Sequence, residues 1–273
     1  MTLSFLLFLS YYSYTFNFSM EAPSVLFLIP CYGGNIMSKC FHSFLNFIPY
    51  ADENGIDHQI QTLSNCSLIS LGRSIMVTSA LKDKDWTHLF WIDSDVAWKP
   101  KHVHYLLAAD KDIVTGFYPA KSLPLKAASG PDKIKKALLD KYPNLDPKGK
   151  IPEKLLKEQI KEEGAFVESS FLTTGFMCIK RNVIEKMVEH YTDLNMSYQG
   201  DEHCHIFETM IDKDRNNLFL GEDYSFVKRA NDIGFKSYLA SKVTLGHVGN
   251  YEYSEENEAK LIKHYITENE SVI

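Results

Sequence analysis

Apolar runs of strand length alternate with helical patterns along the first half of the chain. The apolar runs cover residues 24–30, 89–92 and 112–118, and residues 57–63 add a further candidate strand. The helical patterns cover residues 39–50, 71–80 and 100–109, and the first helix is expected to bury Phe41, Phe44, Leu45 and Ile48. Unbroken apolar runs of this length are typical of strands buried on both faces of a parallel sheet. Strands that alternate with helices therefore predict an α/β fold with a mostly parallel central sheet flanked by helices.

Beyond residue 125 the pattern becomes less regular. Residues 126–163 are rich in Lys, Asp, Glu and Pro, so we expect a charged surface insertion with one or two amphipathic helices. The later elements are expected as a strand over 171–179, a helix over 182–190, a polar loop over 195–216, a helix over 222–233 and short strands over 238–239 and 243–245. Gly234 fits the C-cap of the 222–233 helix, because glycine readily adopts the left-handed conformation found there.

The composition bounds the number of domains and the class of partner. The 273 residues are 45% hydrophobic, and no repeat or interdomain linker divides them. We expect one domain over 21–255, an apolar extension over 1–20 and a charged tail over 256–273. A formal net charge of −6 gives no electrostatic footprint for nucleic acid. The five cysteines contain no C-x-x-C pair, which is typical of reduced thiols in the cytoplasm.

The first 20 residues allow two interpretations. They carry no charged side chain, and their apolar core, residues 5–9, is too short to span a bilayer. A secretory signal would begin with basic residues, and none is present. A misassigned start upstream of Met20 and a signal or membrane anchor both stay open, and membrane association stays open with them.

Two carboxylates one residue apart follow the strand predicted over 89–92. The chain contains four D-x-D sequences, and only the one formed by Asp93 and Asp95 is flanked by apolar residues on both sides. Ligands of α/β proteins gather at the carboxyl ends of the strands, and unpaired buried charge is unfavourable. Proteins hold Mg²⁺ and Mn²⁺ with one or two carboxylates plus substrate phosphates. We therefore expect a divalent cation that bridges to a diphosphate, with a helix-capping role as the alternative.

Two later segments could supply a third ligand and a base. His247 lies in a Leu-Gly-His-Val-Gly segment, whose glycines let the backbone approach a ligand closely, and imidazole suits Mn²⁺ better than Mg²⁺. A structural histidine is the alternative. Glu222 and Asp223 open a predicted helix. Acids there are stabilised by the helix dipole, whereas a carboxylate aimed into a cleft would serve as a general base. Both interpretations stay open.

A polar loop before the 71–80 helix is a candidate anion site. Asn65 and Ser67 lie in this loop, and Arg73 follows at the start of the helix. Helix N-termini attract anions, and the planar guanidinium offers paired donors to a phosphate. We expect these residues to contact a nucleotide or phosphate, with a solvated surface arginine as the alternative.

Seven short segments together carry a family resemblance. They are residues 25–33, 65–73, 90–95, 113–119, 173–177, 221–226 and 246–249. In their order and spacing they resemble the GT-A-fold nucleotide-sugar glycosyltransferases, and most of all the family 2-like enzymes of large viruses, phages and bacteria. The resemblance covers most of residues 24–251. It departs from the family at Leu71-Gly72-Arg73-Ser74, where Arg-Ala-Arg-Asn is frequent.

The resemblance implies a metal-dependent transfer of a sugar from a nucleotide-diphosphate sugar, with UDP or GDP, to a hydroxyl of a glycan, protein or lipid-linked acceptor. Asp93, Asp95 and His247 would hold Mn²⁺ or Mg²⁺, with Asp95 the more direct ligand. The nucleotide sugar would contact Pro30, Tyr32, Asn65, Ser67, Arg73, Asp93, Thr174 and Gly175. Asp223 would match the base of inverting members, with Glu222 beside it. The expected location is the cytoplasm, that of the host for a viral protein.

Three other functions remain as alternatives. A retaining glycosyltransferase could use the same fold, with Asp223 positioning the donor. A nucleotidyltransferase also combines acids with Mg²⁺, but the segment after the first predicted strand lacks the basic, glycine-rich loop that would hold a triphosphate. A sugar-nucleotide or glycan-binding module without turnover is the third alternative.

Overall fold

A computed structural model describes most of the predicted domain. It covers residues 23–121, 141–144, 164–254 and 256–259. The predicted extension over 1–20, the tail beyond 259 and the predicted insertion, apart from 141–144, lie outside the described residues. Within the described part of the chain, no helix is both long and apolar enough to cross a membrane.

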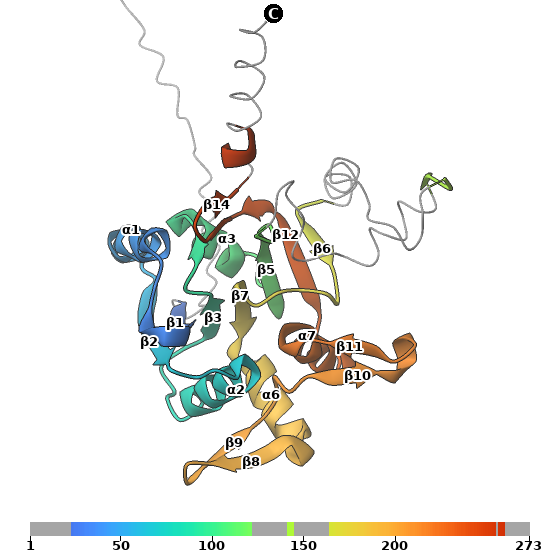
Figure 1. The fold of residues 1–273 in the computed structure, drawn as a ribbon. Helices are drawn as coiled ribbons and strands as arrows, with labels where there is room; N and C mark the ends of the chain where they lie inside the picture. Colours follow the sequence, from blue (N-terminus) through green and yellow to red (C-terminus); the bar gives the residue numbers. More distant parts are fainter. Residues whose placement is uncertain (1–22, 122–140, 145–163, 255, 260–273) are drawn as a thin grey trace, which may run out of the picture.

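A seven-stranded sheet forms the centre of the molecule, in the order β2-β1-β3-β7-β5-β12-β6 (Figure 1). In that order the strands are Asp57–Ser64, Ser24–Cys31, His88–Ile92, Phe176–Lys180, Ile113–Phe117, Ser237–Thr244 and Phe166–Glu168. β1 is parallel to β2 and β3, and β5 is parallel to β12. β7 is antiparallel to both β3 and β5, so the other strands named so far, β1, β2, β3, β5 and β12, share one direction. β6 is antiparallel to β12 and therefore runs in the direction of β7. The prediction of a mostly parallel sheet is confirmed.

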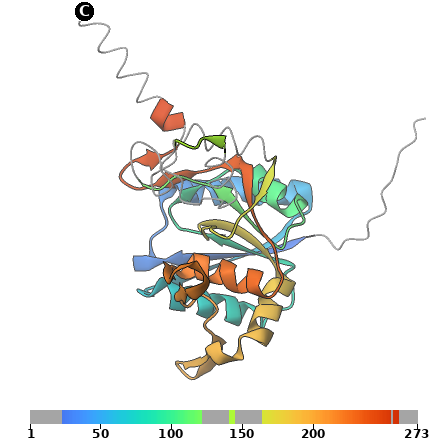
Figure 2. The same ribbon diagram turned by 90° about the vertical axis from the view of Figure 1, so that its right-hand side faces the viewer.

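Helices cover both faces of this sheet (Figure 2). On one face lie α1 (Ser38–Asn54) and α3 (Pro100–Ala108), and on the other lie α2 (Ile69–Ala80), α6 (Arg181–His190) and α7 (Glu222–Asp232). Successive side chains of the apolar strand β1 pack alternately against the two helical layers. Phe27 packs with the α1 and α3 layer, and Leu26 and Leu28 pack with the opposite layer. The predicted α/β fold class is therefore confirmed.

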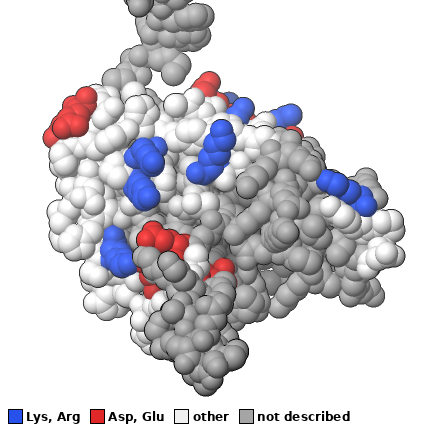
Figure 3. Space-filling view, turned by 90° about the horizontal axis from the view of Figure 1, so that it is seen from above, with Lys and Arg blue, Asp and Glu red and all other residues white. Residues whose placement is uncertain are grey.

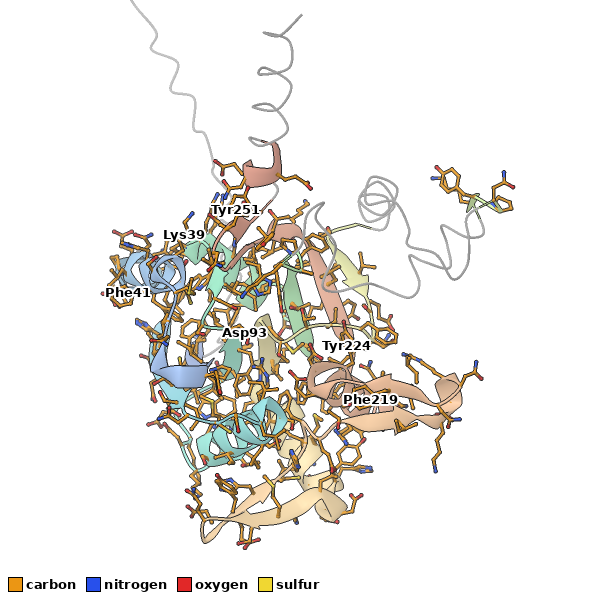
Figure 4. All side chains as sticks on the ribbon, viewed as in Figure 1. Lys39, Phe41, Asp93, Phe219, Tyr224 and Tyr251 are labelled. Atoms are coloured by element: carbon orange, nitrogen blue, oxygen red, sulfur yellow. The ribbon has the colours of Figure 1, made fainter. Side chains whose placement is uncertain are left out.

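The predicted apolar face of α1 was confirmed at Phe44 and wrong at its other three residues. Its buried residues are Cys40, Ser43, Phe44, Phe47 and Ala51. Phe41, Leu45 and Ile48 are instead exposed, and Figure 4 shows Phe41 at the outer edge of the molecule. The rings of Phe44 and Phe47 both meet Phe27 of β1 edge-on, with centroids 5.5 and 5.1 Å away. Contact with the sheet selects this stripe over the equally apolar neighbouring one.

The polar loop expected over 195–216 was also wrong, because two hairpins occupy it. β8 (Asn195–Tyr198) pairs with β9 (Asp201–Cys204), and β10 (Met210–Asp212) pairs with β11 (Leu218–Leu220). The first hairpin turns at Gln199 and Gly200, both at positive φ (54° and 91°). Two consecutive residues in this conformation match the tight turn that suits strand twist. The Gly-containing turn was the signal available in the sequence.

A small sheet joins the C-terminal part of the domain to the acid pair. It consists of β4 (Val96–Ala97), β13 (Gly246–Val248) and β14 (Glu252–Tyr253), and β13 lies between the other two. His247 is paired with Val96 in this sheet, directly after the acid pair. Lys39 of α1 forms an ion pair with Glu252 of β14, and Figure 4 shows Lys39 and Tyr251 at the same end of the molecule. Residues 213 positions apart in the sequence therefore meet at one edge.

Charges on the face seen from above are interspersed (Figure 3). Basic and acidic side chains of the described residues lie in small separate groups among uncharged ones.

Candidate functional site

A pocket of about 330 Å³ lies beyond the carboxyl ends of β1 and β3. Its lining consists of Pro30, Cys31, Tyr32, Leu63, Cys66, Ser67, Ile69, Gly72, Arg73, Asp93, Ser94, Asp95, Glu222 and His247. Figure 4 shows Asp93 in the middle of the molecule, where β3 ends. Parallel strands release their following loops at one edge, which is why residues from distant parts of the chain meet here.

Arg73 binds Asp93, one of the three predicted metal ligands. Its Nη2 donates to Asp93 Oδ1 at 2.7 Å, and its guanidinium carbon lies 5.0 Å from the centroid of the Trp91 ring. Helix α2 begins at Ile69, two residues earlier than expected, so Arg73 lies in the second turn and is only 3% exposed. Arg73 is therefore a buried arginine at this edge of the sheet, and not the solvated surface arginine that was the alternative.

Two nitrogen atoms of the Arg73 guanidinium lack hydrogen-bond partners among the described residues. Nε and Nη1 are buried and unpaired, and the nearest acid to Nε is Glu222, with Oε1 3.9 Å away. Burial alone would lower the pKa of Arg73, but Asp93, Glu222 and Asp223 raise it above its ordinary value. A charged, buried donor pair at the wall of a pocket is suited to an anion, because leaving such donors unpaired is unfavourable.

Asp95 faces His247 across the pocket. His247 Nδ1 lies 3.0 Å from the Pro119 carbonyl oxygen, which can only accept, so Nδ1 carries a proton. His247 Nε2 then faces Asp95 Oδ2 at 3.5 Å. In a protonated ring this nitrogen donates to Asp95, and in a neutral imidazole with the proton on Nδ1 it is an acceptor that could ligate a cation.

A lysine that the sequence analysis did not single out completes this corner. Lys121 Nζ lies 2.5 Å from the same oxygen, Asp95 Oδ2. Burial would raise the pKa of Asp95, but the hydrogen bonds from His247 and Lys121 lower it below its ordinary range. Asp95 is therefore ionised at neutral pH. The position of Lys121, four residues after the carboxyl end of β5, was the signal that could have pointed to it.

The three expected metal ligands are not gathered around one point. Asp93 is turned toward Arg73, whereas Asp95 and His247 face each other. In the part of the chain that the structure describes, no three His, Cys, Asp or Glu side chains form a cluster that could hold a metal ion. Of the three expected ligands, only Asp95 and His247 therefore face each other, and Lys121 contacts Asp95 beside them.

Glu222 and Asp223 lie in the first turn of α7, after Gly221 at its N-cap. Glu222 lines the pocket, and Asp223 lies beside it, with Oδ1 accepting a hydrogen bond from the Tyr224 backbone N–H at 2.9 Å. Burial, followed by the charge of Glu222, raises the pKa of Asp223 from 3.8 to about 6. A carboxylate with a pKa near neutrality is matched to proton abstraction at physiological pH.

Thr174 and Gly175 do not line the pocket, and Gly175 lies behind it, between Asp93 and Tyr118. The Gly175 carbonyl accepts from the Asp93 backbone N–H at 3.1 Å. A Cβ on Gly175 would lie 3.0 Å from Asp93 Oδ2 and closer still to the hydroxyl of buried Tyr118. Thr174 Oγ1 is buried without a hydrogen-bond partner among the described residues. Glycine is required here because backbone, acid and ring meet too closely for a side chain.

The remaining predicted contacts divide into two groups. Pro30, Tyr32 and Ser67 line the pocket, and Tyr32 is 75% exposed, so its ring is available to a ligand. Asn65 does not line it. Its backbone has φ 61°, a left-handed conformation that asparagine tolerates, and it turns the chain between β2 and α2.

Comparisons with known proteins give structural likenesses only. No family model and no curated protein matches the chain. The chain is similar in structure to A197 from STIV, with 20% identity over 83% of this chain and 86% of that one and a TM-score of 0.46. It is similar to the catalytic domain of Drosophila beta1,4galactosyltransferase 7, with 13% identity over 86% and 75% of the two chains and a TM-score of 0.41.

A third similar structure belongs to another class of transferase. It is 4-diphosphocytidyl-2C-methyl-D-erythritol synthase from Anaerococcus prevotii, with 10% identity over 90% of this chain and 100% of that one and a TM-score of 0.43. The structures similar to this chain thus include a galactosyltransferase and a synthase. At these identities and TM-scores, function has to be inferred from the site itself.

Proposed function

We propose that the protein is a metal-dependent glycosyltransferase that moves a sugar from a nucleotide-diphosphate sugar to an acceptor hydroxyl with inversion at the anomeric carbon. The observation that carries this proposal is that one pocket contains both a candidate anion site, at Arg73, and a candidate cation site, at Asp95 and His247. Arg73 lines one wall, and two of its buried N–H groups lack hydrogen-bond partners among the described residues, whereas Asp95 faces His247 on another wall. A diphosphate with a divalent cation would suit both walls, because the anion pairs with the guanidinium and the cation with the carboxylate and imidazole.

Asp95 and His247 are the residues that would hold the cation. Their donor set fits Mn²⁺ in particular, because imidazole suits Mn²⁺ better than Mg²⁺ and a carboxylate suits both. The bond from His247 Nδ1 to the Pro119 carbonyl leaves Nε2 as the ligating atom and fixes the ring. When bound, the cation neutralises the diphosphate as it leaves.

Arg73 would bind the diphosphate from the other side. Its guanidinium is already held by Asp93 and Trp91, so little conformational freedom is lost when the anion binds. Tyr32, exposed at the mouth of the pocket, would stack on the base of UDP or GDP. Asp93 would then position Arg73 rather than bind the cation directly.

Asp223 would take the proton from the acceptor hydroxyl. Its pKa of about 6 leaves it ionised at neutral pH yet basic enough to accept a proton in the transition state. Tyr224 and Phe171 meet edge-to-face beside it, with centroids 5.2 Å apart, and Figure 4 shows Tyr224 near the start of α7. The acceptor is a glycan, protein or lipid-linked molecule in this proposal.

Thermal-shift measurements with UDP-, GDP- and dTDP-sugars, with and without Mn²⁺, test the proposal. A ligand that binds the native state raises its melting temperature, so one nucleotide class should do so only when Mn²⁺ is present. The donor identified in this way is then incubated with a panel of acceptors, and the anomeric configuration of the product is read by NMR. Retention of configuration would assign a retaining enzyme, and absence of any shift with every sugar nucleotide would contradict the proposal.

The Asp95→Asn variant separates the cation from the rest of the site. It should lose the Mn²⁺-dependent part of the shift and at least 100-fold in transfer rate, because an amide is a poor replacement for a carboxylate ligand. Unchanged Mn²⁺-dependent binding in this variant would remove Asp95 from the cation site. A product formed only from a nucleoside triphosphate and a sugar phosphate would assign a nucleotidyltransferase instead.

A further inference from the structure

Three groups converge on one oxygen atom of the acid pair. Lys121 Nζ lies 2.5 Å from Asp95 Oδ2, and His247 Nε2 lies 3.5 Å from the same atom. The ammonium and the imidazole thus contact the same carboxylate oxygen. A cation bound between Asp95 Oδ2 and His247 Nε2 would compete with Lys121 for this oxygen.

The lysine is held in place by its surroundings. Its side chain is 38% exposed, and its Cδ passes 3.6 Å from where a Cβ of Gly249 would lie, so the stem runs along the turn between β13 and β14. The segment after β5 that contains Lys121 also contains Pro119, whose carbonyl orients His247. One short stretch after β5 therefore orients the histidine and neutralises the aspartate.

We propose that Lys121 is a built-in counter-ion of Asp95 that a divalent cation must displace, so that this lysine sets the metal affinity of the site. The inference rests on the proposed function, because it concerns the cation-binding residues of that same site. Like charges at contact distance repel strongly even near a protein surface, so ammonium and metal cannot share Asp95 Oδ2. Metal binding then includes the free energy of breaking the Lys121–Asp95 ion pair.

Direct titration of the protein with Mn²⁺, without nucleotide, measures this competition. Free Mn²⁺ is followed by electron paramagnetic resonance, so the readout does not depend on turnover. The Lys121→Met variant should bind Mn²⁺ roughly two- to fivefold more tightly than the unsubstituted protein, the size expected for a partly exposed ion pair. The Lys121→Arg variant keeps the charge and should bind as weakly as the unsubstituted protein.

Lys101→Met is the matched control. Lys101 is an exposed lysine on α3, so its removal changes the net charge by the same amount without touching Asp95. It should leave the Mn²⁺ affinity unchanged, which separates a contact effect from a general electrostatic one. The Lys121→Gln variant repeats the test with a polar side chain, should the methionine variant fold poorly.

The counter-ion role of Lys121 would be overturned if Lys121→Met and Lys121→Gln bind Mn²⁺ as weakly as the unsubstituted protein or more weakly. Absence of Mn²⁺ binding to all of these proteins would overturn it as well. The proposed function fails in a different way. If Lys121→Met binds Mn²⁺ more tightly but no sugar nucleotide raises the melting temperature, the counter-ion role of Lys121 stands and the glycosyltransferase function is contradicted. If a nucleotide sugar binds but Lys121→Met has unchanged Mn²⁺ affinity, the glycosyltransferase function stands and the counter-ion role is contradicted.

Discussion

The two ends of the central sheet each carry an arginine stacked on a tryptophan, and the two arginines differ in what surrounds them. Arg73 lies over Trp91 at the carboxyl end, and Arg181 lies over Trp86 at the amino end, with guanidinium carbons 5.0 and 4.4 Å from the ring centroids. Arg181 donates to Glu185 and to the backbone carbonyls of residues 81, 83 and 86. Arg73 donates only to Asp93, and two of its nitrogen atoms stay unpaired among the described residues.

The cavities at these two ends differ in the same way. The amino-end cavity is larger, about 700 Å³ against about 330 Å³, and Lys180 and Arg181 in its wall are already paired with acids. The carboxyl-end cavity is smaller and holds the unsatisfied donors of Arg73. Buried polar groups without partners are rare in folded proteins, and each one calls for an explanation. Because of this difference in unmet hydrogen-bonding capacity, we place the proposed ligand site in the smaller cavity, at the carboxyl end.

Replacement of an acid at each end gives the largest expected contrast. Asp223→Asn should lower the turnover of sugar transfer by about 10²- to 10⁴-fold, the usual contribution of a general base, with donor affinity unchanged. Asp110→Asn at the amino end should leave turnover within about twofold, because Asp110 only pairs with Lys180. Initial rates and donor titrations on both variants measure this. Near-full turnover in Asp223→Asn would eliminate it as the base.

Replacement of each arginine by methionine should separate binding from stability. Arg73→Met is expected to weaken donor binding about 10- to 100-fold, since a charge-assisted hydrogen bond contributes roughly 1.5–3 kcal/mol. Arg181→Met should lower the melting temperature and leave donor binding unchanged, because its hydrogen bonds are all internal to the fold. Calorimetric titration of the donor and thermal unfolding check the two variants. Equal donor affinity in both would show that the unpaired nitrogen atoms of Arg73 do not bind the diphosphate.

The sequence predicted the elements of this comparison well where local pattern decides them. The apolar runs that became β1, β3 and β5 were confirmed, because a strand buried on both faces has few polar residues. The buried stripe of α1 was wrong except at Phe44, since two neighbouring stripes are equally apolar and contact with Phe27 selects between them. The hairpins over 195–204 and 210–220 were missed because polar edge strands lack the apolar alternation that predicts a strand.

The sequence predicted which residues line the site better than it predicted which of them contact one another. Arg73, Asp93, Asp95, Glu222 and His247 all line one pocket, as the order of the motifs implied. Which acid pairs with which cation depends on tertiary distances, so the contact of Arg73 with Asp93 had no sequence signal. Lys121 had none beyond its place after a strand, because a single lysine in a charged segment is ordinarily solvated.

A methyl group at each of two glycines tests how tightly the carboxyl end is packed. Gly175→Ala places a Cβ 3.0 Å from Asp93 Oδ2 and closer to Tyr118, so it should destabilise the protein by about 1–3 kcal/mol and weaken donor binding. Gly249→Ala has only ordinary contacts, the nearest at 3.6 Å, and should change stability by less than about 0.5 kcal/mol. Denaturant unfolding compares the two. Equal stability would mean that Tyr118 moves aside without loss.

The pH dependence should distinguish Asp223 from the paired acids. Its pKa is raised from 3.8 to about 6 in the folded state, chiefly by burial and then by the charge of Glu222. Turnover should therefore rise about tenfold between pH 5 and pH 7, with a midpoint near 6. Because the folded state binds this proton more tightly, the contribution of Asp223 to stability is full below pH 3.8 and is lost as the pH rises through about 6.

Asp110 at the amino end should show the opposite dependence. The Lys180 ammonium lowers its pKa, so its small stabilisation is present at neutral pH and is lost in acid. Urea unfolding at pH 4 and pH 7 should thus find Asp223→Asn equal to the unsubstituted protein at pH 4 and more stable by roughly 1–3 kcal/mol at pH 7. Asp110→Asn should never be the more stable protein. Parallel stability curves for Asp223→Asn and the unsubstituted protein would show that Asp223 is solvated, and the comparison between the two ends would then rest on Arg73 alone.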